Sequence, residues 1–491
     1  MSLSATLSNA SSSLYVAGER TSVVSRNIAN AEKAYYSRKS VEVVTIPGSG
    51  VRTSGVVRAE SPVLFRQVLS SSSSTATYQA QVETLDFLDS TINDVELDAS
   101  PAALINKFLS ALQNYSAQPQ SELASKAAVR SAADLANGLN SAASTVRKAR
   151  TEADSGVQAS VDRVNSLLDQ FQTVNDYIVK GTLSGSDVTD YMDQRDEILA
   201  NLSNEVGIRT VSRGNNDMAV YTDSGVTLFD RVPRKLEFVG SGNMTPGLPG
   251  NAVYIDGVPV TGANATMPLQ SGRIVGLVQA RDDISLSYEA QIDEMARVLV
   301  TAFAESDQTG GGGPDVPGLF TYTGASGIPP DGVLISGLAS ALRVNPNVDP
   351  DKGGVATRLR DGGISDPLSP QYVYNTDGSA SYTNRIDELI NKMGANYTFD
   401  PAAKLTSDAS LTDYSATSVG WLEEQRKVAD DGLQYQSTLY QRSFDSFTRI
   451  TGVNLDEELS LMLELERSFQ TSSKLISVVD SMYSALIGAI R

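Results

Sequence analysis

The chain has 491 residues, with 39 basic and 58 acidic side chains, which give a formal net charge of −19. It contains no cysteine and no histidine, so disulfides, Cys/His metal sites, thiol nucleophiles and histidine general bases are excluded. The acidic balance and the lack of a basic cluster argue against nucleic-acid binding, and no apolar run reaches transmembrane length.

Length and the first residues bear on organisation and export. The length corresponds to roughly two to four domains. Residues 1–7 lack both the basic region and the continuous apolar run of a usual secretory signal. If the protein leaves the cell, we expect a route that uses no cleaved signal peptide.

Residues 3–28 show the most regular helical periodicity in the chain. Apolar or small residues recur at alternating spacings of four and three, which is the heptad seam of a coiled coil. The seam consists of Leu3, Leu7, Ala10, Leu14, Ala17, Thr21, Val24 and Ile28. Because several of these side chains are small, the lone helix should be marginal in water. Pairing with the other chain end is therefore favoured over docking on its own domain.

A β-hairpin and then a long helical region are predicted after the first helix. Residues 40–46 alternate and are rich in valine, residues 47–50 form a turn, and residues 51–58 resume the alternation. Helical periodicity, broken at proline and glycine, predicts helices near 62–97, 101–116, 121–150, 153–181 and 187–206. Their heptad-like spacing indicates long helices packed nearly antiparallel. The pattern leaves open whether 121–181 bends near Ser155-Gly156.

Residues 207–265 change to short, alternating apolar segments separated by turn residues. The strand candidates are 208–211, 218–221, 226–229, 235–239 and 253–255. We therefore predict a small β-rich domain inserted into the helical one. Helices are predicted again at 272–305, near 383–394 and at 419–450, with a loop-rich stretch between 310 and 382.

Residues 453–491 predict a long helix that begins afresh after Thr451-Gly452. Gly452 suits the left-handed conformation that often follows the C-terminal end of a helix. Asn454 is a good N-cap for the next helix, and Glu457 is placed for a capping box. The predicted contact face consists of Leu455, Leu459, Met462, Phe469, Ile476, Val479, Tyr483, Leu486 and Ile490. At about 50 Å, this helix needs something to pack against, and the thin seam at the other chain end is the candidate.

No arrangement of residues indicates catalysis, a cofactor or a metal site, and we predict that the chain is not an enzyme. The densest acidic cluster is Asp193-Gln194-Arg195-Asp196-Glu197. Asp193 and Glu197 share a helix face and could hold a cation or act as an acid/base pair. The solvated face of an amphipathic helix is the favoured interpretation, since no other motif converges on this cluster.

Both terminal stretches resemble a known family. Asn27-Ile28-Ala29-Asn30, followed by Tyr36-Ser37-Arg38, resembles the N-terminal signature of bacterial flagellar rod, hook and hook-associated proteins. Thr451-Gly452-Val453-Asn454-Leu455-Asp456-Glu457-Glu458, with residues 466–470 and 478–486, is similar to their C-terminal signature.

Internal segments narrow the resemblance to the family member that joins hook to filament. Residues 191–199 resemble its Asp-Gln-Arg-Asp helix, and Leu342-Arg343-Val344-Asn345-Pro346 resembles its Val-Asn-Pro segment. The sequence Gly-Val-Asn-Leu-Asp-Glu-Glu at 452–458 resembles the same family member. The chain departs from the family at Glu32-Lys33-Ala34-Tyr35, where Asn-Thr-Pro-Gly is usual.

The resemblance implies a mainly α fold with inserted β structure, in three domains. Residues 1–35 and 453–491 would form a terminal coiled coil that lines the inner tube of the flagellum. Residues 36–206 and 266–452 would form a body of long helices with a β-hairpin, and residues 207–265 an outward β-rich domain. On this reading the two terminal seams are assembly interfaces. Glu466 and Ser473 would interrupt the C-terminal seam because neighbouring subunits complete it beside a wet channel.

The implied function is that of a structural junction subunit, exported by the flagellar type III apparatus. Its implied partners are the hook protein (FlgE), hook-associated protein 3 (FlgL), the export chaperone FlgN, and further copies of the chain itself. The hook protein or another axial subunit is the alternative within the family. A secreted ligand-binding protein or enzyme is the alternative outside it, and a polar pocket within 207–265 would favour that alternative.

Overall fold

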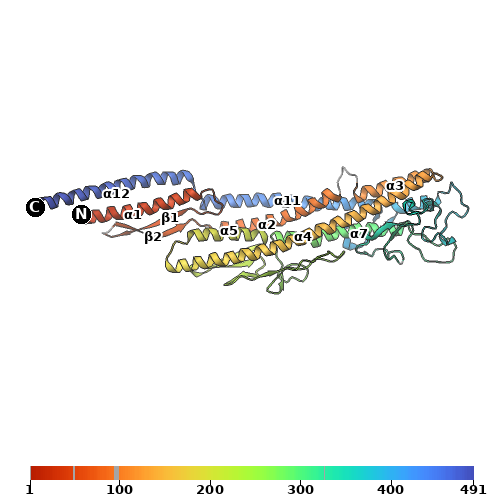
Figure 1. The fold of residues 1–491 in the computed structure, drawn as a ribbon, viewed down its shortest axis with the longest axis horizontal. Helices are drawn as coiled ribbons and strands as arrows, with labels where there is room; N and C mark the ends of the chain where they lie inside the picture. Colours follow the sequence, from red (N-terminus) through yellow and green to blue (C-terminus); the bar gives the residue numbers. More distant parts are fainter. Residues whose placement is uncertain (1, 48–49, 93–98, 326, 491) are drawn as a thin grey trace.

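The computed structural model describes residues 2–47, 50–92, 99–325 and 327–490 of the chain. The molecule is an elongated rod, and both chain ends lie at the same end of it (Figure 1). That end holds the helices α1 (Leu3–Asn30) and α12 (Leu455–Ile490) with the strands β1 (Lys39–Ile46) and β2 (Gly50–Arg58). The mainly α fold with inserted β structure is confirmed, whereas the division into three domains stays a prediction.

Helices, most of them long, form the main part of the rest of the rod. They are α2 (Pro62–Ile92), α3 (Pro101–Ala117), α4 (Glu122–Ser184), α5 (Thr189–Glu205), α6 (Arg273–Gln279), α7 (Ser285–Ala302) and α11 (Leu411–Thr451). A π-helical turn, η2 (Ala280–Ile284), joins α6 to α7. The predicted extension of α2 over 93–97 and residues 48–49 of the predicted turn lie outside the described residues. Within those residues, no helix is both long and apolar enough to cross a membrane.

Helix α4 runs unbroken for 63 residues, which answers the question that the sequence left open. The Ser121 side chain caps its start by accepting a hydrogen bond from Ala124 N, at 3.2 Å. Gly185, with a left-handed φ of 71°, ends it. Gly156 lies inside the helix, where a β-carbon would come within 3.0 Å of Leu277 on α6. The glycine therefore serves close packing of α6 on α4 rather than a bend.

The inserted β structure lies along the C-terminal half of α4 (Figure 1). It consists of two antiparallel sheets, β3 (Ile208–Ser212), β4 (Met218–Thr222) and β5 (Thr227–Phe229), and β6 (Leu236–Glu237), β7 (Tyr254–Ile255) and β8 (Val258–Pro259). Asn165 of α4 binds both the N–H and the carbonyl of Leu236, each at 2.9 Å, and so holds β6 as a neighbouring strand would. Phe171 of α4 packs edge-on against Phe229, with ring centres 4.9 Å apart.

The end of the rod far from the termini is less regular. It contains α8 (Leu338–Ala341), α9 (Arg358–Asp361), α10 (Asn384–Gly394), β9 (Phe320–Tyr322), β10 (Leu342–Val344), β11 (Asn396–Thr398) and β12 (Asp408–Ser410). The β11–β12 pair was not predicted, and α11 begins eight residues before the predicted position 419. Both differences follow from tertiary packing: Tyr414, at the start of α11, stacks on Phe399 with ring centres 3.7 Å apart.

Two hydrophobic cores follow each other along the rod, and a layer of buried charges divides them. The core near the termini includes Val157 and Phe171 of α4, and the far core includes Leu139 of α4. Between them Arg150 of α4 pairs with Glu289 of α7 at 2.8 Å. One helical turn on, Asp154 pairs with Arg281 of the π-helical turn at 2.5 Å, and all four side chains are buried.

Candidate functional site: the terminal helix pair and its junction with the body

Helices α1 and α12 lie side by side and project beyond the body (Figure 1). The predicted N-cap of α12 is confirmed, since Asn454 Oδ1 accepts a hydrogen bond from Asp456 N at 3.1 Å. The predicted left-handed conformation of Gly452 is wrong, because its φ is −74°. A glycine is needed there for another reason: a β-carbon would lie 2.5 Å from the carbonyl oxygen of Thr448.

The buried face of α12 differs from the predicted one. Buried residues recur every seven positions at Glu458, Leu465, Ser472 and Val479. The predicted Met462, Ile476 and Tyr483 are half-buried between them, and Phe469, on the same stripe, is 48% exposed. The seam that faces α1 therefore contains two polar positions, and the spacing of four and three continues through them.

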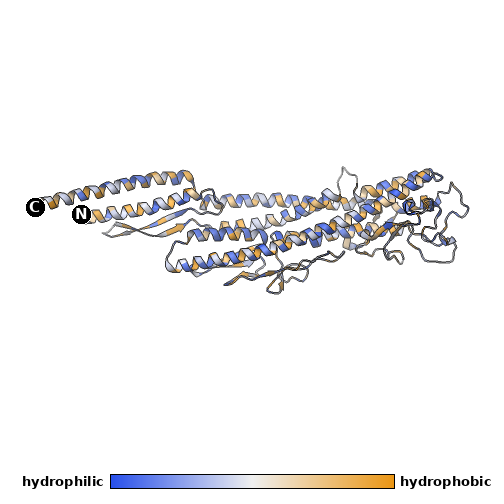
Figure 2. Cartoon of the chain, viewed as in Figure 1, coloured by the Kyte–Doolittle hydropathy of each residue, from blue (hydrophilic) through white to orange (hydrophobic). Residues whose placement is uncertain are grey.

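The remaining described side chains of the predicted face are not covered by α1. Leu455, Leu459 and Leu486 are exposed, as are Glu466 and Ser473, so the last two are not interruptions of the α1-facing seam. Of Ile490, only its place in the helix is described. Apolar residues thus occur around α12 beyond the face that α1 covers (Figure 2). Their role as an assembly surface stays a prediction.

Helix α1 uses two faces. On the predicted seam, Ala10, Ala17 and Val24 are buried, whereas Leu3, Leu7, Leu14, Thr21 and Ile28 are half-buried. Val16 and Val23, which were not predicted, are buried on a second face that they share with Ser12 and Asn27 by helical spacing. The β1–β2 hairpin covers this face, where Ser12 Oγ accepts a hydrogen bond from Val51 N at 3.3 Å. The seven-residue spacing of these two valines is the feature of the sequence that could have predicted the second buried face.

The family motif residue Asn27 is fully buried at the base of the helix pair. Its amide nitrogen donates to the Lys39 carbonyl at 2.9 Å and to Glu458 Oε2 at 3.0 Å. Its oxygen accepts from Lys39 N at 3.0 Å and from the Tyr36 hydroxyl at 3.1 Å. One side chain therefore links α1, the entry to β1 and the first turn of α12.

Arg38 and Glu458 complete this link. The fully buried Glu458 carboxylate accepts a hydrogen bond from Arg38 Nε at 2.6 Å as well as the one from Asn27. The backbone N–H of Arg38 donates to the carbonyl of Thr451 at 2.7 Å, at the end of α11. Because a buried carboxylate needs such partners, the first turn of α12 is oriented by the two motif segments.

Helix α5 supplies acidic side chains to the same place. Lys39, whose side chain is fully buried, pairs with Asp190 and, at 2.9 Å, with Asp193. Arg58 at the end of β2 pairs with Asp193 at 3.1 Å and Asp196 at 2.8 Å. Arg26 of α1 pairs with Asp187 and Asp190. We call these groups together the junction cluster: Arg26, Asn27, Arg38, Lys39, Arg58, Asp187, Asp190, Asp193, Asp196 and Glu458.

The interpretation of the acidic run on α5 as a solvated face is therefore wrong. Asp193 and Asp196 are buried and paired with cations that lie some 140 to 150 residues earlier in the chain. Glu197 is exposed and does not join them, so the alternative of an Asp193–Glu197 cation or acid/base site has no geometric basis. Among the described residues, no group of three or more acidic side chains is arranged to hold a metal ion.

Burial and pairing move the pKa values of these acids in opposite directions. Burial favours the neutral form of Asp190, but hydrogen bonds and charges from Lys39 and Arg26 outweigh it and lower the pKa. For Asp193 and Asp196, burial outweighs the neighbouring cations and raises the pKa. Asp190 is therefore the more firmly ionised partner of Lys39.

Tyr35 marks the point where the chain departs from the family signature. It has a left-handed φ of 62°, at the position where the family usually has glycine. A bulky residue is strained there. Its ring packs edge-on against Phe65 and Phe444, and its hydroxyl lies 3.3 Å from that of Tyr440. These contacts with α2 and α11 hold the strained turn in place.

The other motif residues support the same turn. Ser37 is buried beside Arg38, Asn30 donates a hydrogen bond to the Arg26 carbonyl at 2.8 Å, and Ala29 is exposed. The structure thus brings Asn27 and Arg38 of the N-terminal motif into contact with the start of the C-terminal motif.

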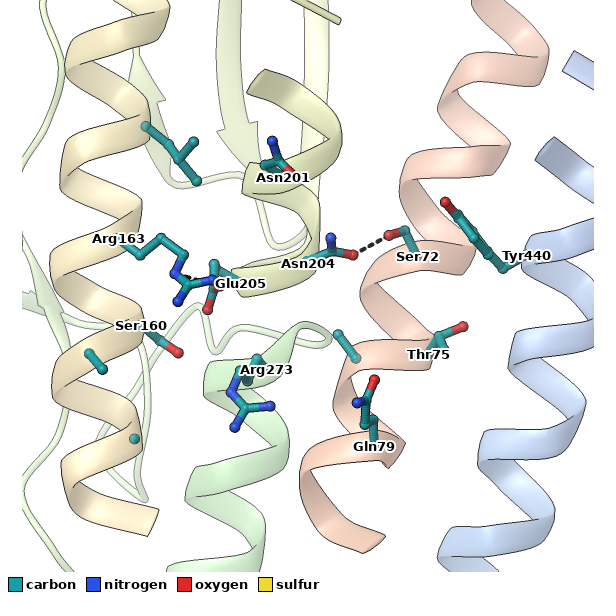
Figure 3. A pocket seen from close by; sticks show the side chains of 14 residues that line it. Ser72, Thr75, Gln79, Ser160, Arg163, Asn201, Asn204, Glu205, Arg273 and Tyr440 are labelled. Carbon is teal, nitrogen blue, oxygen red and sulfur yellow. Dashed lines mark hydrogen bonds and ion pairs between the residues drawn. The ribbon is translucent and has the colours of Figure 1, made fainter. Parts of the chain in front are cut away.

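A polar cavity of about 800 Å³ lies in the body between α2, α4, α5, α6 and α11 (Figure 3). Ser72 hydrogen-bonds to Asn204 across one side, and Arg163 lies 3.4 Å from Glu205 on the other. None of its lining residues belongs to 207–265, so it does not supply the pocket that would favour a ligand-binding β-domain.

Comparisons with known proteins agree with this architecture. Residues 85–318 match the family model of the flagellar hook-associated protein FlgK helical domain. Residues 445–489 match that of the flagellar basal body rod FlgEFG protein C-terminal region.

The chain is also similar to individual flagellar proteins. It is 19% identical to flagellar hook-associated protein 1 of Bacillus subtilis (strain 168), covering 96% of this chain and 95% of the relative. It is 23% identical to the protein of the same name from Escherichia coli (strain K12), covering 91% and 75%. A solved structure of the flagellar hook junction protein FlgK from Burkholderia pseudomallei matches with a TM-score of 0.41 and 20% identity, covering 52% of this chain and 46% of that one.

A rod of long helices with paired chain ends, matched at these two places, defines a bacterial flagellar axial protein. Within that class, the chain belongs to the family of flagellar hook-associated protein 1, FlgK. It is accordingly a structural component of the bacterial flagellum rather than an enzyme, and one that assembles with other flagellar components.

Proposed function

We propose that this chain forms the junction between the flagellar hook and the filament and is needed for filament assembly. The observation that carries the proposal is the terminal helix pair, on which apolar side chains remain exposed. Leu459 and Leu463 of α12, four residues apart and so on one face, are each more than half exposed. A face of this kind on a long helix indicates a surface that other subunits cover.

The proposal includes the neighbours and the route. The hook protein (FlgE) lies on one side, hook-associated protein 3 (FlgL) on the other, and copies of the chain itself lie around the axis. The chain is exported through the flagellar type III apparatus, with the chaperone FlgN protecting the C-terminal helix. Residues 1–35 and 453–491 act as the inner domain, 36–206 and 266–452 as the body, and 207–265 as the outer domain.

We further propose that the outer ends of α1 and α12 are mobile in the free subunit and become ordered on assembly. Pairing the two chain ends closes a loop of more than four hundred residues, at a cost on the order of 5 kcal/mol in a flexible chain. The thin seam with Ala10, Ala17 and Thr21 offers little apolar area against that cost. Hydrogen exchange on the monomer tests this, and slow exchange throughout both helices would contradict it.

The experiment that tests the function is electron microscopy of a deletion strain. We expect hooks without filaments, and wild-type complementation should restore the filaments. Variants with Leu7→Asp or Leu14→Asp should have a folded body but fail to restore filaments, because each substitution places a charge in the terminal seam. Leu123→Asp, on an exposed position of α4, is the matched control and should behave as wild type. Normal filaments in the deletion strain would refute the proposal.

A further inference from the structure

A cleft of about 320 Å³ lies beside the junction cluster, where α2 begins. Four arginines line it: Arg58, Arg66, Arg195 and Arg213. The acidic residues that line it are Glu60 and Asp196, and Arg58 already pairs with both, at 2.8 Å each. In a chain with a net charge of −19, this is an unusual concentration of cations.

Arg195 is the least compensated of these cations. Its side chain is buried, and Nη1 donates to two neutral groups, Asn175 Oδ1 at 3.0 Å and the Asn216 carbonyl at 2.6 Å. Its Nε has no hydrogen-bond partner, and no carboxylate oxygen among the described residues lies within 4.0 Å of the guanidinium. Asp196 attracts Arg195 through space but does not touch it, and a buried charge without a contacting opposite charge is costly, so this place suits an anion.

The other two arginines of the cleft differ in whether they already form an ion pair. Arg213 pairs with Asp230. Arg66 is exposed, forms no ion pair among the described residues, and donates only to the Pro62 carbonyl at 3.3 Å. Arg66 is therefore free to turn toward an anion in the cleft.

The first turn of α2 adds to this positive potential. Ser61 and Pro62 line the cleft, and Phe65 N donates to the Ser61 carbonyl at 2.9 Å, so the 31-residue helix starts at the cleft wall. The N-terminus of a long helix carries partial positive charge and favours an anion.

We propose that this cleft binds an oxyanion, a phosphate or a carboxylate, through Arg195 and Arg66 at the start of α2. Two sources have this chemistry: a free ion, and an aspartate or glutamate side chain of a neighbouring subunit. Arginine suits both because its planar guanidinium matches the oxygen pairs of phosphate and carboxylate. Binding of a free ion by the monomer does not depend on the proposed junction role.

Equilibrium dialysis of the full chain against inorganic phosphate at constant ionic strength tests the free-ion source. We expect one saturable site in the wild type. Arg66→Gln should weaken it at least tenfold, and it should leave the fold intact because Arg66 is exposed. Arg195→Gln should remove the site, with folding checked by circular dichroism. Arg343→Gln, an exposed arginine at the far end of the rod, is the matched control and should bind as wild type.

Complementation of the deletion strain with Arg66→Glu and Arg343→Glu tests the second source. If the monomer binds phosphate and Arg66→Gln weakens that binding, the result supports a free ion. Loss of filaments with Arg66→Glu but not Arg343→Glu, in the absence of phosphate binding, supports a carboxylate of a neighbouring subunit. If phosphate does not bind and both charge reversals assemble normally, the anion site is refuted. Failure of the wild type to restore filaments would count against the junction role alone, since the dialysis result stands without it.

Discussion

At the scale of single residues, Asn27 joins the two chain ends by using its full hydrogen-bonding capacity. Both amide hydrogens and both acceptor positions of the oxygen are occupied, by Lys39, Glu458 and Tyr36. A carboxylate in its place would repel Glu458, and an apolar side chain would leave several buried groups unpaired. Only an amide both donates to a buried carboxylate and accepts from a backbone N–H.

We predict that Asn27→Ala weakens the attachment of α12 to the body by about 3 kcal/mol, since each buried group left unpaired costs about 1–3 kcal/mol. Hydrogen exchange of the amides at 455–462 should become about a hundredfold faster. Exchange in the middle of α4 should not change. Asn30→Ala is the control, because among the described residues the Asn30 side chain bonds only within its own helix, to the Arg26 carbonyl. Equal effects of the two substitutions would contradict this role of Asn27.

The ionic part of the junction cluster should respond to acid. The pKa of Asp187 and of Asp190 is lowered in the folded chain: burial opposes ionisation, and hydrogen bonds from Thr189 and Arg26, or from Lys39 and Arg26, outweigh it. A lowered folded pKa gives stability that is present above the unfolded value of about 3.9 and is lost as pH falls below it.

We therefore predict that Asp190→Asn destabilises the protein at pH 6 and that the difference from wild type shrinks progressively as pH falls below about 3.9. Urea unfolding at a series of pH values measures this. Asp193 and Asp196 have raised pKa values, so their contribution has the opposite sign and declines as pH rises from about 3.9. A wild-type–variant difference that grows on acidification would contradict the assignment of Lys39 to Asp190.

At the scale of elements, α12 presents two apolar faces with separate tasks. Leu465 and Val479 face α1 and are buried, whereas Leu459 and Leu463 lie together on another face and are exposed. A helix that served only to pair with α1 would need only the first face. The second face fits a helix that has further neighbours once the flagellum is assembled.

Leu465→Ala and Leu463→Ala should separate the two tasks. Truncating buried Leu465 should cost the helix pair about 2–5 kcal/mol and speed hydrogen exchange at 455–465 in the free subunit. Leu463→Ala should leave that exchange unchanged, and Leu463→Asp should impair incorporation into flagella. If Leu463→Ala speeds exchange as much as Leu465→Ala, the assignment of the two faces is wrong.

Helices and caps could be predicted where local hydrophobic spacing or capping chemistry determines them. Contacts between residues far apart in the chain could not be predicted in this way. The seam of α1 and the cap at Asn454 follow from spacing and capping chemistry. The predicted seam of α12 differs from the observed one because two of the buried positions, Glu458 and Ser472, are polar. The buried glutamate is explained by its hydrogen bonds with Asn27 and Arg38, which come from the other end of the chain. In the same way, Asp193, Asp196 and Arg195 have the composition of a solvated helix face. Their burial depends on where the β1–β2 hairpin and the turn at Gly214–Asn216 lie in space, which local periodicity does not determine.

At the scale of the whole molecule, the charged layer in the middle of the rod connects parts that the two cores leave separate. Arg150 Nη2 donates to the Leu248 carbonyl, and Arg281 Nη2 donates to the Asn251 carbonyl at 2.9 Å. Asp154 accepts from Ser241 N at 2.8 Å. The loop between β6 and β7 is thus held on the rod by the same side chains that pair α4 with the π-helical turn and α7. We expect such groups to fix how this loop is registered on the body rather than to add much stability.

Removing one member of this layer should therefore be worse than removing both. Arg150→Met leaves Glu289 buried without its partner and should cost about 3–5 kcal/mol, whereas Arg150→Met with Glu289→Met should recover most of that loss. The single tryptophan, Trp421, stacks on Tyr288 beside the layer, so its fluorescence during urea unfolding reports on this region. Lys148→Met, an exposed position on α4, is the control and should change stability by less than about 0.5 kcal/mol. Additive losses in the double variant would mean that the two charges act independently.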